Sequence, residues 1–482
     1  MRVSHGYTVV FDDPNLVSCA GLAPVLQLAE RAGLQDLAAE HVRIGKPGGS
    51  GAEAKVASLV AGMVAGADSI DDMAVLRHGA MGRLFDGVRA PSTLGTFLRT
   101  FTFGHVRQLD AVASRLLINL SKTAPLLAGA DQLAYVDIDD TVKRTYGYAK
   151  EGAGRGYSGV KGLNALLGIV STPGSRPVIT GARLRRGQTN SAKGAHRFVA
   201  DTLVTAKACG ASGVVIARMD SAFYQSDVVA AVLRHQAHYS ITARLLPPVR
   251  KAIEAIAADA WTPIKYTNAV WDDDAQQWIS EAEVAEVPFT AFSSKAKKLQ
   301  ATGRLIVRRV PDVNPANQNP LFTVYRHHAV FTNSPLPMLE AESAHRGHAI
   351  VEQVIADLKA GPLSHLPSGK FWANSAWLVC AAMAFNLTRT AGVLASAFHA
   401  KATTGTIRAQ LISVPGRLAH SARRFTLHLP TGWPWQTAWE RLQAGAALPA
   451  CQRPVGTARR RSAEVPGGGH ESCPLAAMSS AQ

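Results

Sequence analysis

The sequence predicts an α/β fold, and two observations carry this prediction. Between residues 131 and 255, apolar stretches rich in strand formers alternate with stretches whose apolar residues recur at helical spacing. The first of these strands, 133–141, ends in three carboxylates and a hydroxyl. Hydrophobic residues make up 47% of the 482 residues, which is enough for large buried cores. We therefore expect an α/β core with further regions on either side.

The region before this core, residues 1–130, has mostly helical patterns. Short helices joined by tight turns are typical of a DNA reader of the helix-turn-helix kind, and equally of a plain helical bundle. Both interpretations stay open. The expected helices span 22–30, 35–42, 52–65 and a segment that begins at Pro91 and carries Arg99 and Arg107 on its polar side.

The element order within the core is informative. Three strands, a helix and then a parallel strand is the order of a ribonuclease-H-like core, which places its first and fourth strands side by side. Asp139 and Asp220 would then lie on adjacent strand ends. The expected strands are 133–141, 142–148, 163–171, 177–184 and 214–219, and the helix is 191–208.

The chain changes character after residue 255. Aromatic and β-branched residues rise between 260 and 335, with strand-like runs at 264–270, 278–292 and 304–310, and helical patterns return at 343–358 and from 372. The last residues are rich in Pro, Gly, Ser and Arg. We expect a helical N-terminal DNA-binding region at 1–130, a core in two parts at 131–255 and 336–447, a β-rich insertion at 256–335 and a disordered basic tail at 448–482.

Charge and cysteine content limit the class of protein. Lys and Arg exceed Asp and Glu by 51 to 35, a net charge of +16, which favours a polyanionic partner such as nucleic acid over a basic protein without one. The five cysteines form no Cys-x-x-Cys pair, which fits a reducing cytoplasm. The start lacks the apolar core of a signal peptide. Asn386 and Arg389 interrupt the apolar stretch 376–397, so we expect a buried helix there and no membrane span.

Three acidic residues far apart in the chain are candidate metal ligands. Asp139 and Asp220 end predicted strands, and Glu352 lies on a predicted helix. Such carboxylates can hold two divalent ions for phosphodiester chemistry, and hard oxygen ligands suit Mg²⁺, with Mn²⁺ as a substitute. Asp137 and Asp140 compete with Asp139 for the first position. An Asp at a strand end is also commonly a turn or cap residue.

The helix that carries Glu352 has a polar stripe. Positions 345, 348, 352 and 359 differ by 3, 4 and 7, so one helix would present His345, His348, Glu352 and Lys359 on the same side. A stripe of this kind is also typical of a salt-bridged surface.

Together these segments resemble a bacterial insertion-sequence transposase of the DDE class, and most closely the insertion-sequence 1380 group. The likeness extends over about residues 10–430, and the group has a Tyr-x-x-Arg-x-x-x-Glu-x6-Lys signature. The segments that carry it are 137–141, 218–221, 331–334, 345–359 and 371–377. The resemblance implies a ribonuclease-H-like core with a β-rich insertion before the catalytic Glu, and the 132 positions from 220 to 352 leave room for one.

Residue by residue, the resemblance implies that Asp139, Asp220 and Glu352 bind the metal and that Lys359 contacts DNA near the cleaved end. His345 stands where the signature has Tyr and His348 where it has Arg, with Arg346 as an alternative cation. The resemblance also implies cut-and-paste movement in the cytoplasm, at the nucleoid. Its partners would be terminal inverted repeats and target DNA, held by a homodimer.

Basic residues elsewhere are further candidates for contacts with the DNA backbone. Arg183, Arg185 and Arg186 precede a polar turn, and Arg308 lies among basic residues of the expected insertion. An ordinary charged surface is the alternative at each position.

Two other functions fit parts of the sequence. Asp137-x-Asp139-x-Thr141 matches the opening motif of haloacid-dehalogenase-like phosphatases, in which the first Asp is the nucleophile. That reading leaves Asp220 and the net charge unexplained. A non-catalytic DNA-binding protein, either a repressor or a decayed transposase, is not excluded by the composition.

Overall fold

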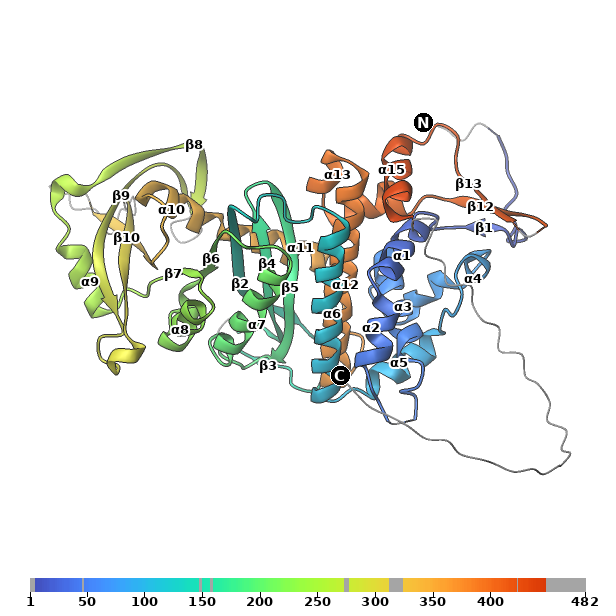
Figure 1. Cartoon of the computed structure of the whole chain (residues 1–482), viewed down its shortest axis with the longest axis horizontal. Helices are drawn as coiled ribbons and strands as arrows, with labels where there is room; N and C mark the ends of the chain where they lie inside the picture. The colour runs from blue at the N-terminus through green and yellow to red at the C-terminus, as the bar shows by residue number, and fades with distance from the viewer. Residues whose placement is uncertain are drawn as a thin grey trace, which may run out of the picture. The chain divides into compact units, whose positions relative to one another are not determined.

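The structure is a computed structural model, shown in Figure 1. It describes residues 5–45, 47–146, 150–156, 159–272, 277–311, 324–422 and 424–447, without the side chains of 266–280. Residues 1–447 form one compact unit. The tail expected at 448–482 lies outside the described residues.

A large mixed sheet runs through this unit and makes the fold α/β (Figure 1). The first strand of this sheet in the chain is β2 (Leu133–Arg144). It pairs antiparallel with β4 (Lys161–Thr172) on one side and parallel with β6 (Val214–Met219) on the other. β4 also pairs with β5, and β6 pairs in parallel with β7. The strands are β2 (Leu133–Arg144), β4 (Lys161–Thr172), β5 (Ser175–Arg186), β6 (Val214–Met219) and β7 (His238–Thr242), with a short β3 (Gly154–Arg155) beside β4. The prediction that the first strand lies beside 214–219 is confirmed.

The β-rich stretch continues the same sheet beyond β7, because β11 pairs antiparallel with β7 and β10 with β11. The added strands are β8 (Thr262–Asp272), β9 (Gln277–Ala291), β10 (Ala301–Pro311) and β11 (Tyr325–Thr332). Sequence patterns predict β8, β9 and β10 but miss β11, where Arg326, His327 and His328 mask the apolar alternation. The strand expected at 142–148 is not a separate strand in its described part, because β2 itself extends to Arg144; residues 147 and 148 lie outside the described residues.

The helices around residues 1–130 pack on a long apolar helix, α12 (Phe371–Ala395), which also contacts β5 (Figure 1). α12 is the one helix in the described residues long and apolar enough to span a membrane, but 89% of its most apolar window is buried in the protein. The prediction of a buried core helix is confirmed. The other helices and small strands of this part are α1 (Leu22–Arg31), α2 (Leu34–His41), α3 (Ala52–Ala65), α4 (Met81–Leu84), α5 (Pro91–Arg99), α6 (Phe103–Thr123), α13 (Ala397–Lys401), α14 (Thr404–Ile407), α15 (Gln436–Ala446), β1 (Leu16–Val17), β12 (Gly416–Ser421) and β13 (Arg424–His428).

The helix expected from Pro91 through Arg107 is two helices, α5 and α6. They separate at Thr102, whose side chain takes part in a capping box with His105. A capping box satisfies two backbone N–H groups at a helix start, so a new helix begins there.

Two helices cover opposite faces of β2. On one face α7 (Ala195–Ala208) comes so close that a Cβ on Gly168 would lie 2.6 Å from Thr202 Oγ1 and 3.2 Å from Ile138 Cδ1. On the other face lies the segment that contains His348, whose imidazole forms a hydrogen bond with Asp137. Because side chains alternate along a strand, Asp137 and Asp139 share the face opposite Ile138. α8 (Ser226–Arg234) packs on α7, and α9 (Pro247–Glu254) follows β7.

The helix expected at 343–358 is interrupted. The structure has α10 (Met338–Arg346), one tight turn at Gly347–Ala349 and α11 (Ile350–Lys359). The four-residue stripe therefore does not lie on a single helix, which corrects the prediction.

Candidate active site

Asp139 and Asp220 lie level with each other on neighbouring parallel strands. The pairing of β2 with β6 ends at Ile138 opposite Met219, and the two aspartates are the next residue on each strand. Neighbouring strands lie about 4.8 Å apart. Asp139 is in the middle of β2 rather than at its end, but it is the first residue beyond the parallel pairing. Both side chains are half-buried.

Burial dominates the electrostatics of this pair. It raises the pKa of Asp139 to about 6; the neighbouring His348 opposes the rise, and the charges of Asp220 and Asp140 add to it. Burial also raises the pKa of Asp220, against a backbone hydrogen bond from Ala222 and the charge of His348. The backbone N–H of Ala222 lies 3.0 Å from Asp220 Oδ1 and fixes the direction of that carboxylate. Two partly desolvated carboxylates that repel each other favour a cation between them.

Asp137 lies one pleat away on the same face and has a different role. It is fully buried, and Arg218 Nε and Nη2 each donate a 2.7 Å hydrogen bond to its two oxygens. His348 Nδ1 donates a third, at 2.9 Å. Burial opposes ionisation, but Arg218 and His348 hold the pKa of Asp137 below its usual value. Both carboxylate oxygens are thus occupied by protein donors.

Asp140 faces the other side of β2, where it forms an ion pair with the buried Arg185. Arg185 also donates to Asn164 Oδ1 at 2.9 Å and to the carbonyl of Ser191 at 2.7 Å. The expectation that Arg185 contacts DNA is therefore corrected, because its guanidinium is turned into the protein. Arg186, the next residue, is exposed.

The turn Gly347–Ala349 and α11, which contacts β2, carry the remaining candidates. His348 interacts electrostatically with Asp139 and Asp220, and Lys359 interacts with Asp139. Burial and Lys143 lower the pKa of Lys359. Glu352 lies between them in sequence, four residues after His348 and seven before Lys359, and its side chain is exposed. The spacing of seven places Glu352 on the same side of α11 as Lys359, which interacts with Asp139.

The structure brings Asp139 and Asp220 together but does not bring Glu352 to them. Within the described ranges, no group of three or more His, Cys, Asp or Glu side chains is arranged to hold a metal ion. Carboxylate oxygens are the ligands that Mg²⁺ prefers, and Mg²⁺ needs only one or two of them with water completing the shell. Asp139 and Asp220 supply such a pair.

Besides Arg185 and His348, which contact Asp140 and Asp137, three further expected DNA contacts have protein partners. His345 is buried between Ser240 Oγ at 2.9 Å and Thr242 Oγ1 at 3.0 Å, and burial lowers its pKa to about 3. Arg346 Nε lies 2.8 Å and Arg308 Nε 3.8 Å from the buried carboxylate of Glu342. The prediction that His345 faces DNA is corrected, because it is a neutral core residue. Arg346 and Arg308 remain partly exposed while sharing Glu342.

Sequence reasoning missed Arg218 as the partner of Asp137. The signal was present, since Asp137 and Arg218 each precede a candidate ligand by two residues, and a period of two places each on the ligand's face. The bidentate geometry depends on their being opposite each other in register, which only the pairing of β2 with β6 reveals.

The protein is of the α/β class, with two level carboxylates, Asp139 and Asp220, on adjacent parallel strands. α11 contacts β2 and carries the third candidate, Glu352. The chain belongs to the family of transposase DDE domains, group 1, whose model matches residues 4–447. A comparison with curated proteins finds no match. Family membership indicates transposase function, with DNA as partner, and DDE transposases generally use divalent metals.

Proposed function

We propose that this protein is an active DNA transposase that cleaves element ends in a metal-dependent reaction and transfers the freed strand into target DNA by a cut-and-paste route. One observation carries the proposal: Asp139 and Asp220 follow the same register pair of β2 and β6. Their partial burial supports it, because a desolvated acidic pair is costly unless a cation compensates it.

The strand order supports a ribonuclease-H-like core. It runs β5, β4, β2, β6, β7, with the first three strands antiparallel and the last two parallel to β2. In this scheme β8 to β11 are an insertion between β7 and α10, and the core resumes with α11 and Glu352.

In this proposal Asp139, Asp220 and Glu352 hold two Mg²⁺ ions, with Mn²⁺ as a substitute. Bound divalent ions supply an activated oxygen nucleophile and stabilise the leaving oxygen. Binding of metal and DNA brings the exposed Glu352 side chain to the aspartate pair. Lys359 and the exposed Arg186 neutralise phosphate charge next to the site, and His348 lies between the carboxylates and the DNA.

The remaining expectations extend the proposal. The chain belongs to the insertion-sequence 1380 group, its helical N-terminal region recognises the terminal inverted repeats, and a homodimer holds both ends in the cytoplasm. Inverted repeats on both sides of the gene, with short direct duplications outside them, are the supporting genomic observation.

The phosphatase alternative conflicts with the geometry of Asp137. A nucleophilic carboxylate needs a free oxygen that faces its substrate, whereas Asp137 is fully buried and both of its oxygens accept hydrogen bonds. The second alternative, a non-catalytic DNA-binding protein, predicts that DNA binding persists while no strand is cut.

The test is cleavage of a supercoiled plasmid that carries the two element ends, with Mg²⁺ or Mn²⁺. We expect wild-type protein to release 3′-hydroxyl ends, and Asp139→Asn, Asp220→Asn and Glu352→Gln each to reduce cleavage at least about 1,000-fold while binding DNA normally. Asp131→Asn is the matched control, because this exposed aspartate lies just before β2 and outside the site. Wild-type binding without cleavage would favour the non-catalytic alternative.

A further inference from the structure

The buried ion pair Asp137–Arg218 lies on the same face of the sheet as the two aspartates, one pleat away. Asp137 lies opposite Arg218 in the pairing of β2 with β6, and Ile138 lies opposite Met219 one residue further along the strands. The guanidinium carbon of Arg218 also stacks 4.0 Å from the ring centroid of Tyr135. Arg218 and Asp137 are only 3% and 0% exposed, so the pair is sealed from water.

This ion pair reaches beyond the sheet to the junction between α10 and α11. Arg218 Nη1 donates a 2.5 Å hydrogen bond to the carbonyl of Ala344, in the last turn of α10. On the other side of the junction, His348 Nδ1 donates to Asp137. One buried pair therefore holds the chain on both sides of Gly347.

Gly347 is the position that permits this arrangement. Its φ is −60°, an ordinary helical value that any residue adopts, so backbone conformation does not require a glycine. A Cβ at this position would lie 2.8 Å from Arg218 Nη1. The missing side chain leaves the space in which the guanidinium reaches Ala344.

We propose that Asp137, Arg218 and His348 are positioning residues that clamp the α10–α11 junction to β2 and β6, and so fix the start of α11, the helix that carries Glu352. The inference rests on the proposed function. Glu352 follows His348 by about one helical turn, so the direction of α11 is fixed close to the carboxylate it carries. A buried pair with full hydrogen bonding suits this task, because its geometry is strongly specified.

The sharpest test is Gly347→Ala. The substitution adds one methyl group and changes no charge, and φ of −60° suits alanine, so any loss of stability comes from the displaced guanidinium. The methyl group displaces the guanidinium from Ala344 and releases α11. Gly405→Ala is the matched control, since Gly405 lies in α14 and its added Cβ would meet only Thr403 Oγ1, at 3.8 Å.

We expect Gly347→Ala to lower kcat for Mg²⁺-dependent cleavage roughly 10- to 100-fold, as a small misplacement of a catalytic group does, with KM for DNA nearly unchanged. Mn²⁺ should recover part of this loss, because Mg²⁺ demands stricter geometry. Arg218→Lys should act in the same direction, since an ammonium group cannot reproduce the two-pronged contact with Asp137. Combining Gly347→Ala with Glu352→Gln should add little to the loss caused by Glu352→Gln alone.

Hydrogen–deuterium exchange provides a readout that does not depend on cleavage. Backbone amides of residues 345–355 should exchange several-fold faster in Gly347→Ala than in wild type and Gly405→Ala, with other segments unchanged. Unchanged exchange in this segment, or wild-type cleavage by Gly347→Ala, would overturn the clamp. A wild-type chain that never cuts DNA would instead contradict the proposed function, and exchange would still decide the clamp.

Discussion

Arg185 and Asp140 form a buried ion pair on the face of β2 opposite the candidate metal site. Arg186, the next residue along β5, is exposed. Two adjacent arginines of the same motif therefore have different roles. One stabilises the fold, and the other is available to DNA.

This difference predicts opposite effects of two alanine substitutions. Arg185→Ala should lower the free energy of unfolding by about 2–4 kcal/mol, because it leaves the partly buried Asp140 without its partner. Arg186→Ala should change it by less than about 0.5 kcal/mol and weaken DNA binding, with a smaller dependence of affinity on salt. Urea denaturation and binding at several salt concentrations measure both effects. Equal destabilisation by the two variants would contradict this assignment.

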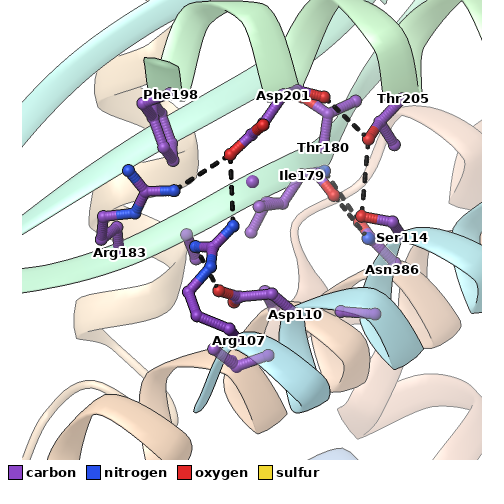
Figure 2. A pocket seen from close by; sticks show the side chains of 15 residues that line it. Arg107, Asp110, Ser114, Ile179, Thr180, Arg183, Phe198, Asp201, Thr205 and Asn386 are labelled. Carbon is purple, nitrogen blue, oxygen red and sulfur yellow. Dashed lines mark hydrogen bonds and ion pairs between the residues drawn. The ribbon is translucent and has the colours of Figure 1, made fainter. Parts of the chain in front are cut away.

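A second network predicts a pH dependence of stability. Asp110 on α6 accepts from Arg107 at 2.6 Å, and Arg107 and Arg183 both reach Asp201 on α7, around a cavity of about 50 Å³ (Figure 2). Burial raises the pKa of Asp110 to about 6, and the two arginines oppose the rise.

A carboxyl group with a raised pKa binds its proton more tightly in the folded state. Its ionisation therefore lowers the free energy of unfolding as pH rises from about 4 to above 6. Asp110→Asn should therefore be more stable than wild type at pH 7, by about 1–3 kcal/mol, and the difference should shrink toward pH 4. Thermal or urea unfolding at both pH values measures this, with Asp131→Asn as the exposed control. A variant less stable than wild type at pH 7 would show that the contact with Arg107 outweighs burial.

The edge of β5 is closed by a side chain of α12. Asn386 accepts a 2.8 Å hydrogen bond from the backbone N–H of Ile179 and donates a 2.8 Å hydrogen bond to its carbonyl (Figure 2). Asn386→Ala should destabilise the protein by about 2–4 kcal/mol, because two buried backbone groups lose their partners. Gln353→Ala removes a single exposed contact with Arg176, so it should lower the free energy of unfolding far less in the same denaturation experiment. Similar costs would contradict the role given to Asn386.

Much of the fold follows from local pattern. Helix α3 and strand β6 match their predicted bounds. Gly51 and Gly66 flank the apolar residues of α3, and β6 is a short apolar run between Gly213 and Asp220. β11 was missed, since polar residues occupy its first half and its pairing with β7 depends on distant sequence.

The site was predictable only in part. The alternation along β2 separates Asp139 from Asp140, but whether an arginine binds DNA or a buried carboxylate depends on partners such as Asp140 and Glu342 that the sequence does not reveal. The break at Gly347 is missed because the helical spacing of His345, His348 and Glu352 continues across it.

Metal binding by the aspartate pair tests the central claim most directly. Isothermal titration of Mn²⁺ should be made with wild type, Asp139→Asn, Asp220→Asn and the double variant. If the two carboxylates share one ion, each single substitution should weaken that binding at least about tenfold, and the double variant should bind little worse than either single variant. Wild-type affinity in the single variants, or two independent and additive losses, would contradict a shared metal site.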